Sequence, residues 1–456
     1  MGGARLKKVK RRTYSIFGLI LAIGVLMTVF IFRLAADGEA WALFPSNPNV
    51  FRGGNLAVGA IYDRNDVPLF ETTDHIPRFH PNENVRRATM HVVGDRGGNI
   101  GTGALHAFGR QLVGYNLITG TYSWDGAGNS LHLTIDAELS AVALGALGQR
   151  HGSVVVMNYE TGDILVAVSS PTYDPQNPPT FGADNPAPTG IFLNRGLSSA
   201  LVPGSVFKIV TAAIAMDTLD DAMSRTFNCT GALVVDGNRV TCMRAHGTVR
   251  MAEAMGHSCN GFFAQLALDL GAPQMRREME RFGLISTHAV DGLPVAAGNF
   301  GDAERGSAAL AWAGVGQGEN LLNPLSTARF LGAIPRGGTP IEPRLIDNFT
   351  GNLLPWSAGP TVGEQIMDPR VAVDLVTLLR NTAINYYGNT FPNLAVAGKT
   401  GTAEVGEGRR PHSWFIGFLD DPANPLAFVV VVENGGFGIE AAAPVVNTVL
   451  QAAVRR

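Results

Sequence analysis

Lysine is scarce in this chain. Of its 35 basic residues only five are lysines, and three of those lie within the first ten residues. Arginine supplies surface charge equally well but stays protonated, whereas a buried lysine can shift to the neutral amine. The two lysines beyond residue 10, Lys208 and Lys399, are therefore candidates for chemistry rather than for solvation.

The chain also lacks an excess of charge of either sign. Its 456 residues are 46% hydrophobic and carry a formal net charge of −3. This balance excludes the strongly basic footprint of a nucleic-acid-binding protein. It predicts a globular chain that is long enough for more than one domain.

Long apolar runs are rare, and the one that stands out lies near the N-terminus. Residues 14–32 carry no charge, and residues 1–12 carry six positive charges. This pattern predicts a membrane-spanning helix at 13–33, with a cytoplasmic basic tail at 1–12 and the rest of the chain outside the cytoplasm. A cleaved signal peptide is the alternative, because Ala40-Trp41-Ala42 faintly resembles a cleavage site. The run is longer than a usual signal core, so we favour an uncleaved, single-pass anchor in the cell membrane.

The remaining sequence divides near residue 131. Residues 34–130 are rich in glycine and asparagine with short alternating runs, and we expect a small β-containing pedestal there. In residues 131–456, runs at 153–157 and 163–169 have the pattern of a β-hairpin, and further strand-like runs lie at 413–419 and 426–433. The order predicts an α/β domain in which one sheet is assembled from both ends, with helices between.

The stretch from Pro203 to Lys208 has the pattern of a helix start. Pro203-Gly204 breaks the preceding element, Ser205 stands where a helix begins, and an apolar run follows. Lys208 is three residues after Ser205 and so lies on the same helical face, one turn away. A serine hydroxyl is a poor nucleophile until a nearby base takes its proton, and an amine at this spacing can do so. Alone, the pattern is weak, because a chain of this length contains about one by chance.

Two further motifs follow in order, and the three are specific in combination. They are Ser258-Cys259-Asn260 and Lys399-Thr400-Gly401-Thr402. The trio resembles the active site of the penicillin-binding proteins and serine β-lactamases. The resemblance covers residues 50–450 and implies an antiparallel sheet flanked by helices, plus an all-helical subdomain. One departure is Val206, where the family usually has threonine; the position is expected to face away from the chemistry.

The resemblance implies catalytic roles for the first two motifs. Ser205 attacks a D-alanyl-D-alanine carbonyl, and Lys208 takes its proton. Ser258, on a loop between helices, relays the proton to the leaving amine, and Asn260 holds the amide backbone of the substrate.

The third motif is expected on a sheet strand. There Lys399, also assigned as catalytic, and Thr400 place a charge and a hydroxyl near the substrate carboxylate. Gly401 shares a face with Lys399, and its missing side chain lets the strand edge approach the substrate. The backbone amides of Ser205 and Thr402 are expected to form the oxyanion hole. We predict Thr400, Gly401 and Thr402 as substrate-binding residues.

Two rival motifs carry less weight. The sequence around Lys399 resembles the end of a phosphate-binding loop, but the glycine required five residues before Gly398 is replaced by Asn393. Glu319 lies in a run that resembles the deacylating glutamate motif of some β-lactamases. That run sits inside a Gly-x-Gly…Pro-Leu segment, 316–325, which resembles a transpeptidase segment, so we do not expect a hydrolytic role.

The three cysteines and ten histidines give no metal or cofactor expectation. Cys229 and Cys242 flank a predicted hairpin and are either bonded in a disulfide or reduced, while Cys259 is left unpaired. The histidines lack the spacing of metal ligands, and His257 is expected to be a packing residue.

We therefore expect a class B penicillin-binding protein, a D,D-transpeptidase that cross-links peptidoglycan stem peptides through an acyl-Ser205 intermediate and is inhibited by β-lactams. Because no glycan-polymerising domain fits before the serine motif, we also expect a SEDS-family glycan polymerase as a partner. A D,D-carboxypeptidase, a β-lactamase and a non-catalytic penicillin sensor are the alternatives.

Overall fold

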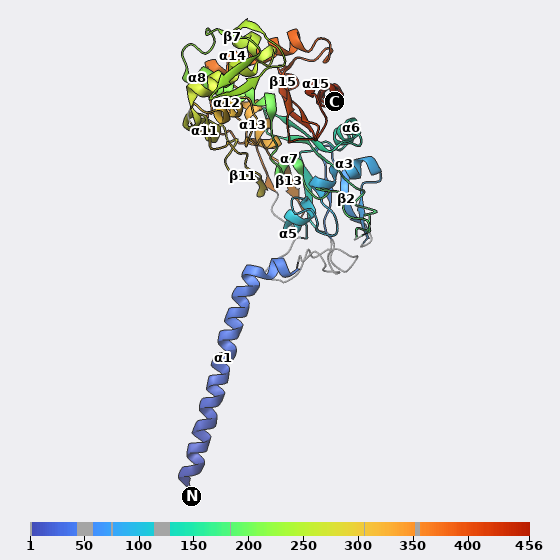
Figure 1. Cartoon of the computed structure of the whole chain (residues 1–456). Coiled ribbons are helices and arrows are strands. Elements are labelled where there is room, and N and C mark those ends of the chain that lie inside the picture. The colour runs from blue at the N-terminus through green and yellow to red at the C-terminus, as the bar shows by residue number, and fades with distance from the viewer. Residues whose placement is uncertain are drawn as a thin grey trace.

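The computed structural model describes residues 2–42, 58–73, 76–113, 128–182, 184–304, 306–351 and 356–456. Its first element is one long helix, α1 (Gly2–Ala42), which stands away from the other elements (Figure 1). An apolar stretch within Arg5–Asp37 has a mean hydropathy of 2.6, and none of it is buried. By length and composition this helix fits a membrane anchor, as the sequence predicts.

A six-stranded sheet lies at the end of the molecule nearer α1 (Figure 1). Its order is β14-β13-β4-β1-β2-β3. The elements of this region are β1 (Ile61–Tyr62), β2 (Pro68–Thr73), β3 (Ile76–Phe79), α3 (Glu83–Val93), α4 (Ala104–Ala107), α5 (Gly109–Val113), β4 (Ser130–Leu133), β13 (Ile346–Thr350) and β14 (Trp356–Ser357). Residues 43–57 and 114–127 of the expected pedestal lie outside the described residues.

Strands from both sides of residue 131 build this sheet. β4 pairs in parallel with β1 and antiparallel with β13, which comes from the distant part of the chain. The boundary expected at residue 131 therefore falls within β4, and the division into pedestal and catalytic domain stays a prediction.

The second sheet has five strands in the order β15-β16-β17-β5-β6, and every neighbouring pair is antiparallel. The strands are β5 (Gly152–Asn158), β6 (Ile164–Ser170), β15 (Val396–Ala403), β16 (His412–Leu419) and β17 (Leu426–Val432). The expected hairpin and the assembly of one sheet from both ends of the domain are confirmed. β15 lies at the edge of this sheet, which leaves one side of its backbone facing away from β16.

Helices cover both faces of the five-stranded sheet, which is why its strands read as continuous apolar runs. Because side chains alternate along a strand, Val154 and Val156 pack in one core and Val155 in the other. The first core includes α6 (Ala137–Leu147) and α15 (Gly438–Ala453); the second includes α7 (Arg195–Ser198), α8 (Lys208–Thr218) and α13 (Pro324–Ala333).

The remaining elements form the helical region around the second motif. Its helices are η1 (Gly204–Phe207), α9 (Met251–Gly256), α10 (Asn260–Leu270), α11 (Ala272–Arg281), α12 (Ala308–Ala313) and α14 (Pro369–Tyr386). Short two-stranded ribbons accompany them: β7 (Phe227–Cys229) with β10 (Gly247–Val249), β8 (Ala232–Val235) with β9 (Asn238–Thr241), and β11 (His288–Val290) with β12 (Leu293–Val295). The predicted fold class is confirmed. The β8–β9 ribbon is the hairpin predicted between Cys229 and Cys242, and the other two ribbons are an addition to the all-helical subdomain that the sequence predicts.

Candidate active site

Ser205 lies in the tight turn η1, which leads directly into the buried helix α8. Gly204 before it has φ of 57°, and a Cβ atom there would meet the backbone oxygen of Thr402 at 2.4 Å. Only glycine accepts this backbone without strain. Ser205 is half-buried, and Val206 beside it is fully buried, as expected for a position that faces away from the chemistry.

The amine of Lys208 joins the first two motifs. Its Nζ lies 2.9 Å from Ser205 Oγ, 2.9 Å from Ser258 Oγ and 2.6 Å from Asn260 Oδ1, and a further hydrogen bond goes to the backbone oxygen of Ser258 at 2.8 Å. The residue is fully buried. Burial holds the pKa of Lys208 well below its usual range, and the nearby charge of Lys399 lowers it further. A free amine in contact with the serine hydroxyl is what a base requires.

The second motif lies on the loop between α9 and α10, as predicted. Ser258 has φ of 54°, a conformation that non-glycine residues rarely adopt and that the surroundings must enforce. Asn260 begins α10, and its Nδ2 donates a hydrogen bond to the backbone oxygen of Thr241 at 2.7 Å. These contacts turn the Ser258 hydroxyl and the Asn260 amide oxygen toward Lys208.

The third motif lies on the edge strand β15, and alternation divides its side chains between two faces. Thr400 and Thr402 are among the described residues that line the cleft at Ser205, whereas Lys399 and Gly401 are not. A Cβ at Gly401 would meet Val206 Cγ1 at 2.8 Å and the backbone oxygen of Pro203 at 2.9 Å. The expected role of Gly401 is therefore corrected: its missing side chain lets β15 approach the serine turn, rather than the substrate.

Lys399 is buried beneath this strand. Its Nζ donates a hydrogen bond to the backbone oxygen of Thr400 at 3.0 Å. Burial lowers the pKa of Lys399 to about 7, so its charge is sensitive to pH in the neutral range.

Tyr387 contacts Thr400 of the third motif, and the sequence did not predict this contact. It follows α14, and its hydroxyl accepts a hydrogen bond from the backbone N–H of Thr400 at 3.0 Å and lies 3.4 Å from Thr400 Oγ1. Burial raises the pKa of Tyr387, so the phenol stays protonated. No motif marks this tyrosine, because only the packing of α14 against β15 brings it there.

The cleft at Ser205 has a volume of about 500 Å³. Besides the motif residues, its lining includes Gln317, from the segment 316–325 that resembles a transpeptidase segment. It also includes Trp312, Glu404, Phe437 and Ile439, which the sequence did not single out. Glu404 directly follows β15, so its position in the sequence just after the third motif could have predicted that it lines the cleft.

The sequence predicts no catalytic role for Glu319 or His257. Glu319 is exposed and lines a neighbouring cavity with Gly301 and Asn320, rather than the cleft at Ser205. His257 stacks on His246 and contacts Tyr386 edge-on, as expected for a packing residue, and it also lines the cleft at Ser205.

A serine in contact with a buried lysine, a second serine on a helical loop and a lysine on a sheet edge are features of the penicillin-recognising serine enzymes. Residues 152–451 match the family model described as the penicillin binding protein transpeptidase domain. The chain therefore belongs to the penicillin-binding protein transpeptidase family.

Relatives and solved structures agree with this assignment. The chain is 32% identical over 385 residues to the peptidoglycan D,D-transpeptidase PbpA of Mycobacterium tuberculosis, and the match covers 76% of each protein. It is 28% identical to the stage V sporulation protein D of Bacillus subtilis, over 71% of this chain and 53% of that protein. The structure of penicillin-binding protein A from M. tuberculosis as a ceftriaxone acyl-enzyme complex superimposes with a TM-score of 0.78 at 26% identity, covering 89% of this chain and all of the other.

Proposed function

We propose that the protein is a peptidoglycan D,D-transpeptidase that works through an acyl-enzyme on Ser205. The observation that carries this proposal is the buried Lys208 amine, which contacts Ser205, Ser258 and Asn260 at once. Relatives named peptidoglycan D,D-transpeptidase, and neighbours solved as β-lactam acyl-enzymes, support it.

In the first step Ser205 Oγ attacks the carbonyl carbon between the two terminal D-alanines of a stem peptide, and its proton passes to Lys208 Nζ. The negative charge on the carbonyl oxygen is stabilised by the backbone N–H groups of Ser205 and Thr402. The carbon–nitrogen bond then breaks. The leaving amine takes the proton from Lys208 through the hydroxyl of Ser258, and D-alanine departs, leaving an ester on Ser205.

In the second step the amine of a neighbouring stem peptide attacks the ester carbonyl. Its proton passes through Ser258 to Lys208 and then to Ser205 Oγ, which leaves as the free hydroxyl. Thr400 binds the carboxylate of the donor peptide through its hydroxyl, and the positive charge of the buried Lys399 attracts the same carboxylate. In this proposal Asn260 holds the amide backbone of the substrate through its side chain.

A β-lactamase forms the same ester but activates water to break it. Because Glu319 lines the neighbouring cavity rather than the cleft at Ser205, we expect a penicilloyl-Ser205 adduct that survives for many minutes and a lifetime that does not change in Glu319→Gln. Mass spectrometry of the intact protein after a pulse of penicillin measures both. Hydrolysis within seconds that Glu319→Gln abolishes would assign the enzyme to the β-lactamases.

Stem peptides distinguish a transpeptidase from a carboxypeptidase and from a penicillin sensor. With donor and acceptor peptides present, a transpeptidase yields a cross-linked dimer. Release of D-alanine without a dimer would indicate a carboxypeptidase, and a stable penicilloyl adduct with no product from either peptide would indicate a sensor.

The pH dependence of acylation follows from the two lysines. Lys208 must lose its proton to act as a base, so the rate rises as pH passes the lowered pKa of Lys208. Lys399 loses its charge as pH rises through about 7, so carboxylate binding weakens above that pH. We expect a bell-shaped pH profile of the second-order acylation constant, with an acid limb set by Lys208 and an alkaline limb set by Lys399 near pH 7.

Lys399→Arg tests the alkaline limb of this profile. Arginine stays charged, so the fall above about pH 7 should disappear while the acid limb remains. An unchanged alkaline limb in Lys399→Arg would assign that limb to another group.

We further propose that α1 spans the cell membrane with the basic tail in the cytoplasm, so that the catalytic cleft faces the peptidoglycan, and that a SEDS-family glycan polymerase binds α1 and the N-terminal sheet. The six positive charges in residues 1–12 support this orientation. Replacing α1 by an unrelated membrane helix should lower co-purification of the polymerase. Unchanged recovery when both α1 and the N-terminal sheet are replaced would contradict the partnership.

A further inference from the structure

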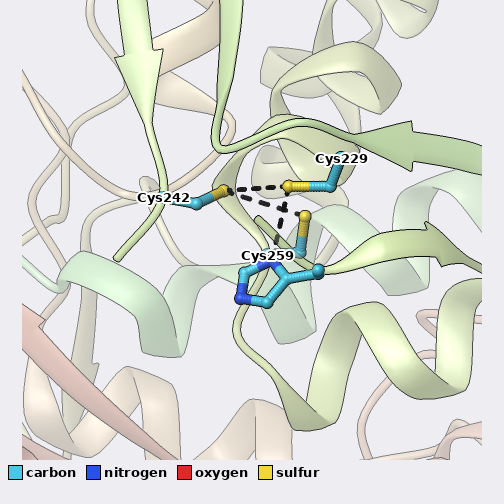
Figure 2. A group of neighbouring side chains, drawn as sticks. Cys229, Cys242 and Cys259 are labelled. Carbon is cyan, nitrogen blue, oxygen red and sulfur yellow. Dashed lines mark hydrogen bonds between the residues drawn. The ribbon is translucent and has the colours of Figure 1, made fainter. Parts of the chain in front are cut away.

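All three cysteines of the chain meet at one point, together with a histidine. The sulfur atoms of Cys229, Cys242 and Cys259 and a ring nitrogen of His246 all lie within 4.8 Å of one another (Figure 2). Each comes from a different element. Cys229 ends β7, Cys242 follows β9, His246 precedes β10 and Cys259 caps α10.

Three of the separations between these atoms match the edges of a tetrahedral zinc site. Cys229 Sγ lies 3.7 Å from Cys242 Sγ and 3.4 Å from His246 Nδ1, and Cys242 Sγ lies 3.8 Å from Cys259 Sγ. Zinc bonds of about 2.3 Å to sulfur and about 2.0–2.1 Å to nitrogen place tetrahedral ligand atoms roughly 3.5–3.8 Å apart. All three cysteines are free.

The backbone holds the cluster in place. The backbone N–H of His246 donates to the backbone oxygen of Cys229 at 3.1 Å, and that of Cys242 donates to the backbone oxygen of Gly231 at 2.9 Å. The N–H of Gly261, in the first turn of α10, donates to Cys242 Sγ at 3.4 Å. A hydrogen bond from the positive end of a helix stabilises sulfur as a thiolate, the form that binds metal.

We propose that Cys229, Cys242, His246 and Cys259 bind one zinc ion as a closed, four-coordinate structural site. Three thiols give up their protons on binding and the imidazole binds in its neutral form, so the site carries a net charge of −1 and undergoes no redox change. Three sulfur ligands and one nitrogen ligand in a tetrahedron favour zinc over harder cations, which prefer oxygen. The spacing of histidines gave no such expectation, because three of the four ligands are cysteines and the fold alone gathers them.

The ion would position the second catalytic motif. Cys259 lies between Ser258 and Asn260, and Asn260 is tied to the backbone oxygen of Thr241, the residue before Cys242. A metal at the cluster clamps the end of the β8–β9 ribbon to the loop that carries Ser258 in its unusual backbone conformation. Zinc binding at this cluster does not depend on the proposed transpeptidase function. Only the expected effect of zinc on acylation rests on that function.

The test uses the full chain in detergent, purified without a metal-affinity tag or chelator. We expect about one zinc per chain by inductively coupled plasma mass spectrometry. Cys229→Ser and His246→Gln should each lower the zinc content about tenfold or more, while His151→Gln, at an exposed histidine of the same domain, should leave it unchanged. Cobalt in place of zinc should give a thiolate-to-metal charge-transfer absorption that the two ligand variants lose.

The wild-type chain alone also decides the question, should the variants fail to fold. Its three thiols should react slowly with a thiol reagent until a zinc chelator is added, and chelation should slow acylation by penicillin about tenfold or more until zinc is restored. A metal-free protein whose thiols all react at once would overturn the proposal. So would a peptide map with Cys229 and Cys242 in a disulfide.

Discussion

Lys208→Arg is expected to keep the fold but to slow acylation by penicillin by a factor on the order of a thousand or more. Lys208 is fully buried, and its lowered pKa supplies a free amine 2.9 Å from Ser205 Oγ. A guanidinium stays protonated and cannot take the serine proton. The measurement is the second-order acylation constant with a fluorescent penicillin.

Lys10→Arg is the matched control, because it makes the same substitution at an exposed lysine of α1 and should acylate like the wild type. Thermal melting separates a chemical defect from an unfolded protein. Acylation of a folded Lys208→Arg at near the wild-type rate would mean that the base is misassigned.

Asn260→Asp is also expected to slow acylation at neutral pH, by a different route. The substitution keeps the shape of the side chain but puts a carboxylate where Asn260 Oδ1 now lies, 2.6 Å from Lys208 Nζ. An opposite charge at this distance favours the ammonium and raises the pKa of Lys208. The base is then protonated at neutral pH, and acylation should fall by about a hundredfold or more, recovering as the pH is raised through the new pKa.

Asn260→Ala distinguishes this effect from the loss of hydrogen bonds. It also removes the contacts to Lys208 and Thr241, but it adds no charge, so the acid limb of its pH profile should stay at the wild-type position. An acid limb in Asn260→Asp that coincides with that of Asn260→Ala would contradict the electrostatic account.

The sheet was predictable because its signals are local. The runs of β5, β6, β16 and β17 are continuous and apolar, as expected for strands that helices cover on both faces. The N-terminal sheet was predicted only as a β-containing module. β13 and β14 join it from beyond residue 340, and nothing in their own sequence indicates a partner so far away.

In the active site, too, contacts between residues close in the sequence were predictable, and contacts between distant residues were not. Ser205 and Lys208 share one helical turn, so their contact follows from spacing, and Ser258 and Asn260 followed from the family resemblance. Tyr387 and the metal cluster depend on how separate elements pack, which no spacing reveals. Gly401 was placed on the correct face of β15, but what that face contacts, the serine turn, depends on tertiary packing.

The strand order of the N-terminal sheet also constrains when this protein can finish folding. Leu133 of β4 pairs with Ile346 of β13, so β4 keeps an open edge until the later segment has been made. At roughly 5–20 residues per second of synthesis, that delay is on the order of ten seconds or longer. An unpaired strand edge exposed for so long is a template for association with other chains. The nascent protein is therefore vulnerable to association with other chains until β13 has been made and has paired with β4.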